Sequence, residues 1–321
     1  MGNKIKWGVL GCAGIAKGCF IPGILKAGNA ELYAIASRSA SDKLTAFQNE
    51  FHPVKTYESY EALLDDADVQ AVYIPLPNGL HAEWTIKALN KKKHVMCEKP
   101  MGATPLEAID MQQAAEKNGV WLMEAFAYLH SPLTARVKEL VDNGAIGSLR
   151  FIDGHFTFNN MAATNVRYSA DLAGGATFDV GCYPISLIRY LVGTEPTGIV
   201  ATGTIGSSGV DITSCTTLLF EGGITAVAYC SFEDFRRSEY TVLGENGVIR
   251  VPFPFNYEGT AEIIIETADS IKKETIECPH NYMLEVEQFG RVIADGEKPF
   301  VSPAFTLGNA VVIDEILRQI R

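Results

Sequence analysis

Residues 8–20 read GVLGCAGIAKGCF and join an apolar run to the first segment of helical character. A glycine-rich turn of this kind leaves backbone N–H groups at the positive end of a helix dipole, where a phosphate can bind. The G-x-G-x-x-G/A pattern here has alanine at its second position and an additional glycine. Two interpretations therefore stand, a phosphate-binding turn or a small-residue turn that packs helix on strand. The candidate cofactor-binding residues are Gly11, Cys12, Ala13, Gly14, Ile15 and Ala16.

Short apolar runs alternate with stretches of helical period between residues 4 and 125. We expect strands at residues 6–10, 31–36, 69–74, 94–97 and 120–123, with helices between them. This alternation is typical of a parallel sheet with helices on both faces. Together with the glycine turn, it predicts a Rossmann dinucleotide-binding domain with a doubly wound parallel sheet over residues 1–125.

The pattern changes to strands of period two after about residue 148, and short turns join many of them. The run of strands is interrupted by residues 160–191, which begin irregular and become helical near Tyr183, and the chain closes with helices at 282–294 and 305–320. Period-two strands with short connections favour antiparallel pairing. We expect a second, α+β domain with an open, mainly antiparallel sheet over residues 126–321, which binds the substrate and forms the dimer contact.

Composition excludes several classes of protein. The 321 residues carry a net charge of -11, which disfavours nucleic acid as a partner. No apolar run is long enough for a membrane span, and the first residues lack the apolar core of a signal peptide, so we expect a cytoplasmic protein that does not bind membranes. The seven cysteines show no CxxC pair, which predicts reduced thiols and no metal site.

The end of the second expected strand bears on the choice of cofactor. An NAD site offers a carboxylate to the ribose 2′-hydroxyl at this point, whereas an NADP site has a small residue and an arginine. Here Ser37 and Arg38 follow the strand, and no acidic residue occurs before Asp42. The sequence predicts that NADP(H) is preferred over NAD(H), the alternative being that Arg38 is a solvated charge at a strand end.

Residues 94–102 read HVMCEKPMG and place Glu98 and Lys99 where an apolar strand ends. Ligands of doubly wound sheets bind beyond the carboxyl ends of the strands. Hydride transfer at a carbonyl carbon needs a group that moves the hydroxyl proton, and a lysine whose pKa falls from about 10.4 toward neutrality can do so. Lys99 is therefore the candidate proton-transfer residue.

Three motifs carry a resemblance to a known family: PLPNGLHAEW at 75–84, HVMCEKP at 94–100 and GGATFDVGCYP at 174–184. Together they resemble the glucose-fructose oxidoreductase and inositol dehydrogenase (Gfo/Idh/MocA) family, in its branch of sugar and trans-dihydrodiol dehydrogenases. The resemblance extends from about residue 4 to residue 191 and more faintly to the end of the chain.

The first two motifs imply roles for residues of the first domain. Lys99 matches the catalytic lysine, Glu98 a neighbour that helps to hold the cofactor, and Pro100 a proline that is cis in the family. Pro77, Asn78 and His81 match a Pro-Asn-x-x-His loop that lines the cofactor. Taken without the family, His81 can equally be a capping or core histidine.

The third motif implies that Asp179 and Tyr183 face the substrate. In a helix the two residues lie on one face, one turn apart, so that Tyr183 can relay a proton while Asp179 orients it or binds a neighbouring hydroxyl. The alternative is a helix cap followed by a core tyrosine. Arg167 resembles an arginine near the substrate mouth, and Leu129 stands where the family often has an arginine, so the contact of that arginine is absent or replaced.

These observations predict an NADP-dependent dehydrogenase or reductase that acts on a hydroxyl or carbonyl of a sugar, polyol or diol. We expect a homodimer formed through the second-domain sheet, or a dimer of such dimers. Two alternatives stay open: a non-catalytic NADP(H)-binding sensor on the same fold, and an enzyme whose tightly bound cofactor shuttles hydride between two sugars.

Overall fold

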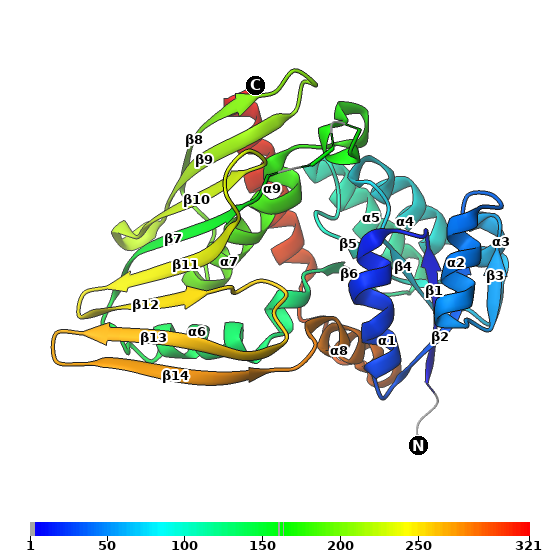
Figure 1. Ribbon diagram of the computed structural model, residues 1–321, viewed down its shortest axis with the longest axis horizontal. Helices are drawn as coiled ribbons and strands as arrows, with labels where there is room; N and C mark the ends of the chain where they lie inside the picture. Colours follow the sequence, from blue (N-terminus) through cyan, green and yellow to red (C-terminus); the bar gives the residue numbers. More distant parts are fainter. Residues whose placement is uncertain (1–3, 160, 163) are drawn as a thin grey trace. The chain divides into compact units, whose positions relative to one another are not determined.

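The computed structural model describes residues 4–159, 161–162 and 164–321, which form two compact units. The first unit extends to Ala127 and also contains His280–Leu307, while the second contains Tyr128–Pro279 and Gly308–Arg321 (Figure 1). Asn160, the expected start of the irregular stretch, lies outside the described residues.

The first unit is built on a six-stranded parallel sheet with the order β3-β2-β1-β4-β5-β6. The order reverses between β1 and β4, where a doubly wound sheet binds its ligand. The predicted fold class is confirmed, with one strand, β3, that we did not expect. The strands are β1 Ile5–Leu10, β2 Ala30–Ala36, β3 Lys55–Tyr57, β4 Ala71–Ile74, β5 His94–Glu98 and β6 Leu122–Ala125.

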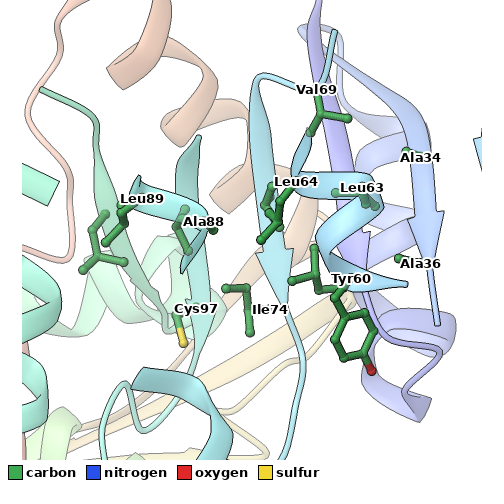
Figure 2. Close-up of a cluster of buried hydrophobic side chains, with 14 of the residues drawn as sticks. Ala34, Ala36, Tyr60, Leu63, Leu64, Val69, Ile74, Ala88, Leu89 and Cys97 are labelled. Atoms are coloured by element: carbon green, nitrogen blue, oxygen red, sulfur yellow. The ribbon is translucent and has the colours of Figure 1, made fainter. Parts of the chain in front are cut away.

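The helices of this unit begin where the sequence supplies caps. The Ser59 and Thr104 side chains accept hydrogen bonds from the N–H groups three residues later and start α3 and α5. Figure 2 shows part of the core between helices and sheet, where Leu63, Ile74 and Cys97 pack together out of water. The helices are η1 Ala16–Phe20, α1 Ile21–Lys26, α2 Asp42–Phe51, α3 Tyr60–Asp65, η2 Asn78–Leu80, α4 His81–Asn90, α5 Pro105–Asn118 and α8 Asn281–Asp295.

Helix α8 joins the first unit although it follows all the strands of the second. Its residue Tyr282 comes so close to α1 that a Cβ added at Gly23 would lie 2.9 Å from the Tyr282 backbone, so only glycine fits there. Phe289 of α8 packs against Trp7 of β1 with ring centroids 5.8 Å apart. Compared with the expected division into 1–125 and 126–321, residues 280–307 therefore lie with the first unit.

The second unit is built on an eight-stranded sheet with the order β14-β13-β12-β11-β7-β10-β9-β8. Only β7 and β10 pair in parallel, so the sheet is mainly antiparallel, as predicted. Burial alternates along the strands: Val242 is fully buried, whereas its neighbour Leu243 is 38% exposed. The strands are β7 Leu149–Thr157, β8 Gly198–Ile205, β9 Asp211–Leu219, β10 Thr225–Ser231, β11 Arg237–Gly244, β12 Gly247–Pro252, β13 Gly259–Thr267 and β14 Ile271–Cys278.

Helices of the second unit include α7, which packs on β7 and β10, and α6, which packs on β14. A single turn of π-helix, η6, leads directly into α7 and places Asp179 and Tyr183 in consecutive turns. The helices are α6 Pro132–Asp142, η4 Val166–Tyr168, η5 Ala170–Leu172, η6 Thr177–Gly181, α7 Cys182–Val192 and η7 Glu221–Gly223, while η3 Ala127–His130 and α9 Pro303–Ile320 have residues in both units.

Candidate active site

The glycine turn lies at the carboxyl end of β1, beside the point where the strand order reverses. Gly11 has a φ of 120°, and an added Cβ would lie 3.1 Å from a methyl group of Leu76, so the turn requires glycine. Its N–H donates to the carbonyl oxygen of Ala36 over 2.9 Å. Helical structure runs from residue 14 to residue 26, and the first N–H groups of a helix have no acceptor within it. Residues 11–16 therefore offer donors that fit a pyrophosphate.

The small residues of this turn have different surroundings. Ala16 is fully buried against the sheet, which is the packing role. Gly14 is exposed, and a Cβ added there would meet no atom within 4 Å. The glycine at this position is thus not required by packing, and the turn is open on the side of Gly14, where a ligand can approach its backbone.

Positive charge lies along one side of the turn. Burial raises the pKa of the Tyr60 phenol, and the positive charge of Arg38 opposes that rise. In the same way burial raises the pKa of Cys12 to about 11 against the opposing charge of Lys43. Arg38 and Lys43 are exposed, and the Ser37 hydroxyl lies 3.3 Å from that of Ser41. Two cations with neighbouring hydroxyls fit a 2′-phosphate.

The segment after β5 is held by buried carboxylates. Glu98 is 7% exposed, and its carboxylate accepts a hydrogen bond from the Tyr73 hydroxyl and another, of 3.2 Å, from the N–H of Lys99. The N–H of Met101 donates to Glu124 over 2.8 Å. The Lys99–Pro100 peptide bond is cis, as the resemblance implied. The backbone on both sides of Lys99 is therefore fixed, and its half-buried side chain leaves from the carboxyl end of the sheet.

His81 is fully buried at the start of α4. Its Nδ1 lies 2.9 Å from the carbonyl oxygen of Pro100, and its Nε2 lies 2.8 Å from that of Leu76. Burial lowers the pKa of His81 against the opposing effect of the two carbonyl contacts, which favours a neutral ring whose single N–H donates to one of the two oxygens at a time. This placement corresponds to the core-histidine alternative: His81 ties the loop that carries Pro77 and Asn78 to the backbone that follows Lys99.

Sequence reasoning missed Glu285, a fully buried carboxylic acid on α8. Burial and then the negative charge of Glu98 raise the pKa of Glu285 well above its ordinary value. Burial raises the pKa of the Tyr73 hydroxyl, and negative charge on Tyr282 and on Glu285 would raise it further. The Tyr73 ring stacks on Phe20 with centroids 3.5 Å apart. The available signal was an acidic residue on a helix face that is otherwise buried.

The substrate candidates of the second unit form one cluster. Arg167 of η4 donates from its Nε to Asp179 Oδ2 over 2.6 Å. Burial lowers the pKa of the Arg167 guanidinium, but Asp179 and, to a smaller extent, Tyr183 raise it, so that the net shift is upward. Arg167 therefore lies near Tyr183 as well as Asp179. The structure thus brings Arg167, Asp179 and Tyr183 together, with the arginine paired to the aspartate.

Aromatic rings hold Tyr183 in place. Its ring centroid lies 5.2 Å from those of Phe156 and Phe255 and 5.7 Å from that of Tyr128. The Tyr183 hydroxyl accepts a hydrogen bond of 3.2 Å from the side-chain amide of Asn256, a residue that sequence reasoning did not single out. Leu129, at the position where an arginine was expected, is 2% exposed, so a charge there would be costly.

Other kinds of site find little support in the residues that the structure describes. Among them, no group of three or more histidine, cysteine, aspartate or glutamate side chains is arranged to hold a metal ion. In the same part of the chain, no helix combines the length and the apolar character needed to cross a bilayer. All seven cysteines are free thiols in this structure.

The chain is similar to known proteins over most of its length. Residues 5–126 match the model of an oxidoreductase family with an NAD-binding Rossmann fold, and residues 134–250 match the GFO/IDH/MocA C-terminal domain. D-xylose 1-dehydrogenase (NADP(+)) 2 of Haloferax volcanii is 37% identical over 313 residues, which cover 97% of this chain and 95% of that protein. Trans-1,2-dihydrobenzene-1,2-diol dehydrogenase of Xenopus laevis is 26% identical over 98% of both chains.

A solved structure is similar over nearly the whole chain. It is a 3-ketoreductase from Actinomadura kijaniata in complex with NADP and TDP-benzene, 30% identical, with a TM-score of 0.94 over 99% of this chain and 98% of that one. Single-residue variants of the same ketoreductase, one at a tyrosine and one at a lysine, have been crystallised too. The matches to both family models, which extend over most of the chain, show that it belongs to the Gfo/Idh/MocA family of oxidoreductases.

Proposed function

We propose that the protein transfers a hydride between NADP(H) and a hydroxyl or carbonyl carbon of a sugar, polyol or diol. The observation that carries this proposal is the placement of Lys99: its backbone is fixed by Glu98 at the carboxyl end of β5, in the same sheet whose β1 ends in the phosphate-binding turn. A relative named as an NADP(+)-linked xylose dehydrogenase and another named as a dihydrodiol dehydrogenase support the substrate class.

Lys99 handles the proton of the reacting hydroxyl. Bound NADP(H) supplies or accepts the hydride. In the direction of reduction the Lys99 ammonium donates a proton to the oxygen that becomes a hydroxyl, and in oxidation the neutral amine removes it. The structure holds the lysine backbone through hydrogen bonds, so its side chain alone has to move during proton transfer.

Tyr183 and Asp179 complete the proposed catalytic group. The Tyr183 hydroxyl can hydrogen-bond the reacting oxygen and relay a proton, while the Asp179 carboxylate, held by Arg167, binds a neighbouring hydroxyl. In the related ketoreductase the lysine and tyrosine chosen for substitution are separated along the chain by as many residues as Lys99 and Tyr183 are here. This coincidence supports the pairing of these two residues in one reaction.

The adenine end of the cofactor is assigned to the turn and the end of β2. We propose that the backbone of residues 11–16 binds the pyrophosphate and that Ser37 and Arg38 bind the 2′-phosphate. Pro77, Asn78 and Glu98 would line the cofactor. His81 would support the loop of Pro77 and Asn78 through its contact with the Leu76 carbonyl. The NADP(+)-linked xylose dehydrogenase and the ketoreductase solved with NADP support this choice of cofactor.

A substrate panel tests the proposal. Purified protein is mixed with aldoses, polyols and diols together with NADP+, and with ketosugars or aldehydes together with NADPH, and absorbance of the reduced cofactor is followed. We expect turnover that falls by about 10² to 10⁴ in Lys99→Met and is retained in Lys91→Met, an exposed lysine paired with Asp65. Turnover of Lys99→Met within threefold of the parent would exclude Lys99 as the proton-transfer residue.

The same measurements distinguish the two alternatives. A sensor would bind NADPH but show no turnover with any substrate of the panel. An enzyme that retains its cofactor would show the absorbance of reduced nicotinamide in the purified protein after addition of a sugar, without added NADP+. Release of the cofactor on dilution would exclude that second alternative.

We also propose a homodimer through the open face of the second-unit sheet. Apolar side chains are exposed along this face, among them Val200 at 58%, Leu219 at 41% and Leu243 at 38%. Each is followed or preceded by a buried residue that points the other way, toward the helices. Light scattering should give twice the chain mass for the parent and a lower mass for Leu219→Glu.

A further inference from the structure

The connection between β12 and β13 contains two unusual backbone conformations. Phe253 and Asn256 both have a φ of 53°, in the left-handed region. Asparagine adopts this region several-fold more readily than most residues, whereas for a bulky phenylalanine it is a real outlier. Such conformations cost free energy and persist where the surrounding structure determines them, often at functional sites. The connection is therefore held in a defined shape.

Phe255 anchors this connection next to Tyr183. Its ring is 9% exposed, stacks on Phe156 at 5.6 Å and an interplanar angle of 7°, and meets the edge of Tyr128 at 5.0 Å. Tyr183 packs against the same ring at 5.2 Å. With Phe255 in place and Asn256 in the left-handed conformation, the side chain of Asn256 reaches the hydroxyl of Tyr183.

Asn256 is exposed, and its Nδ2 donates to the Tyr183 oxygen over 3.2 Å. This hydrogen bond occupies one acceptor site of the phenol and leaves its own O–H hydrogen to be donated elsewhere. It also stabilises the phenolate more than the phenol. The hydrogen bond therefore sets both the direction of the Tyr183 proton and the ease with which Tyr183 releases it.

We infer that Asn256 is a positioning residue for proton transfer by Tyr183, an inference that rests on the proposed function. Asn256 keeps the phenol hydrogen directed at the substrate and favours its release. The charged and titratable neighbours of Tyr183 include Tyr128, whose ring centroid lies 5.7 Å from its own, and Arg167, which pairs with Asp179. Asn256 is a neutral donor beside them, so its contribution can be removed without altering the charge of the cluster.

Three variants separate this role from a structural one. Asn256→Gly keeps the left-handed backbone and deletes the amide. Asn256→Asp replaces the donor with an acceptor, which would bind the Tyr183 hydrogen and raise the phenol pKa. Tyr257→Phe is the matched control, because it deletes a hydrogen bond of 3.1 Å to the Thr260 carbonyl in the same connection. Thermal midpoints of all variants confirm that each folds.

The experiment is a double-mutant cycle with Tyr183→Phe, read as kcat and KM across pH. We expect Asn256→Gly to lower kcat about threefold to tenfold with little change in KM. Asn256→Asp should lower kcat further and move the alkaline limb of the kcat profile to higher pH. Tyr257→Phe should match the parent. In the Tyr183→Phe background the effect of Asn256→Gly should vanish.

Two results would overturn the inference, and a third would overturn its premise. An equal loss from Asn256→Gly in the parent and in the Tyr183→Phe background would mean that Asn256 acts on the fold, and no loss in the parent would mean that it does nothing. If Tyr183→Phe itself retains full kcat, the proposed role of Tyr183 fails and the positioning role fails with it.

Discussion

Replacing Arg38 by alanine should strongly reduce the preference for NADP(H) and leave NAD(H) binding nearly unchanged. Arg38 is exposed at the end of β2, with the Ser37 hydroxyl beside it and with no carboxylate between residues 37 and 41 to meet a 2′-hydroxyl. A hydrogen bond to a charged group contributes roughly 1.5 to 3 kcal/mol. At about 1.4 kcal/mol for each tenfold change, the dissociation constant for NADPH should rise about tenfold to a hundredfold.

The exposure of Arg38 makes this contribution sensitive to salt. Charges in water are screened over about 8 Å at physiological ionic strength and over about 3 Å at 1 M. The preference of the parent for NADPH should therefore shrink as salt rises, whereas NADH affinity should change little. The positive charge of Lys43 acts on Cys12 of the same turn, so Lys43 can also attract the 2′-phosphate. A smaller preference for NADPH should therefore persist in Arg38→Ala at low salt.

The assay is titration of NADPH and NADH fluorescence against the parent and three variants at low and high salt. Arg38→Lys keeps the charge but not the planar fork, so its loss should be intermediate. Arg318→Ala removes an exposed arginine of α9 that pairs with Asp314, and it should bind like the parent. Equal affinity of the parent for both cofactors, or an Arg38→Ala variant that loses NADH as badly as NADPH, would refute the assignment.

Two further predictions concern the catalytic group and a buried acid. In the proposed mechanism Tyr183 relays a proton and Asp179 positions the substrate. Tyr183→Phe should therefore lower kcat less than Lys99→Met does, while Asp179→Asn should also raise KM. Steady-state kinetics measures both effects, and unchanged kcat and KM in both variants would contradict the assignment. Burial raises the pKa of Glu285, so the folded protein keeps this acid protonated at pH values at which the unfolded chain has already lost the proton. The contribution of Glu285 to the free energy of unfolding is therefore fully present below the ordinary pKa of about 4.3 and is lost as pH rises through the folded-state pKa. Glu285→Gln should therefore gain thermal midpoint over the parent as pH rises above about 5, and parallel curves for the two proteins would contradict the protonated state.

Much of the first unit could be predicted because its signals are local. Apolar runs mark buried strands, and caps such as Ser59 and Thr104 mark where helices begin, so the alternating pattern is visible over short windows. The strand β3 escaped prediction because its three residues are only half-buried and lie at the sheet edge, where little apolar character is needed. The β-strand propensities of three residues are too weak to predict a strand of this kind.

The membership of α8 in the first unit could not be predicted for a different reason. Its amphipathic pattern predicts a helix and a buried face, but not which surface covers that face. The partner is set by contacts with residues far away in the chain, such as Gly28, whose N–H donates to Glu287 over 3.0 Å. Glu285 was missed for the same reason. It is close to Glu98 in space, where the charge of Glu98 raises its pKa, but far from Glu98 in the sequence.

For the candidate site, sequence reasoning selected residues at strand ends and did not select those that support them. Lys99 and Arg38 could be selected as candidates because the ends of parallel strands carry ligands whatever the details of the loops. Asn256 could not, because its contact with Tyr183 depends on a left-handed turn that its own sequence permits but does not require. His81 was found through a motif, yet its two carbonyl partners became apparent only in the structure.

The hydrogen bonds around Lys99 explain why its substitution should report on chemistry and not on folding. After β5 the chain runs through residues 99–103 without regular structure, and three of its N–H groups, those of Lys99, Met101 and Ala103, donate to glutamate carboxylates. Hydrogen bonds to charged groups contribute roughly 1.5 to 3 kcal/mol each, and none of these three involves the lysine side chain. The backbone that presents Lys99 is therefore specified from outside the side chain, and methionine at this position retains the apolar stem while removing the ammonium group to which we assign proton transfer.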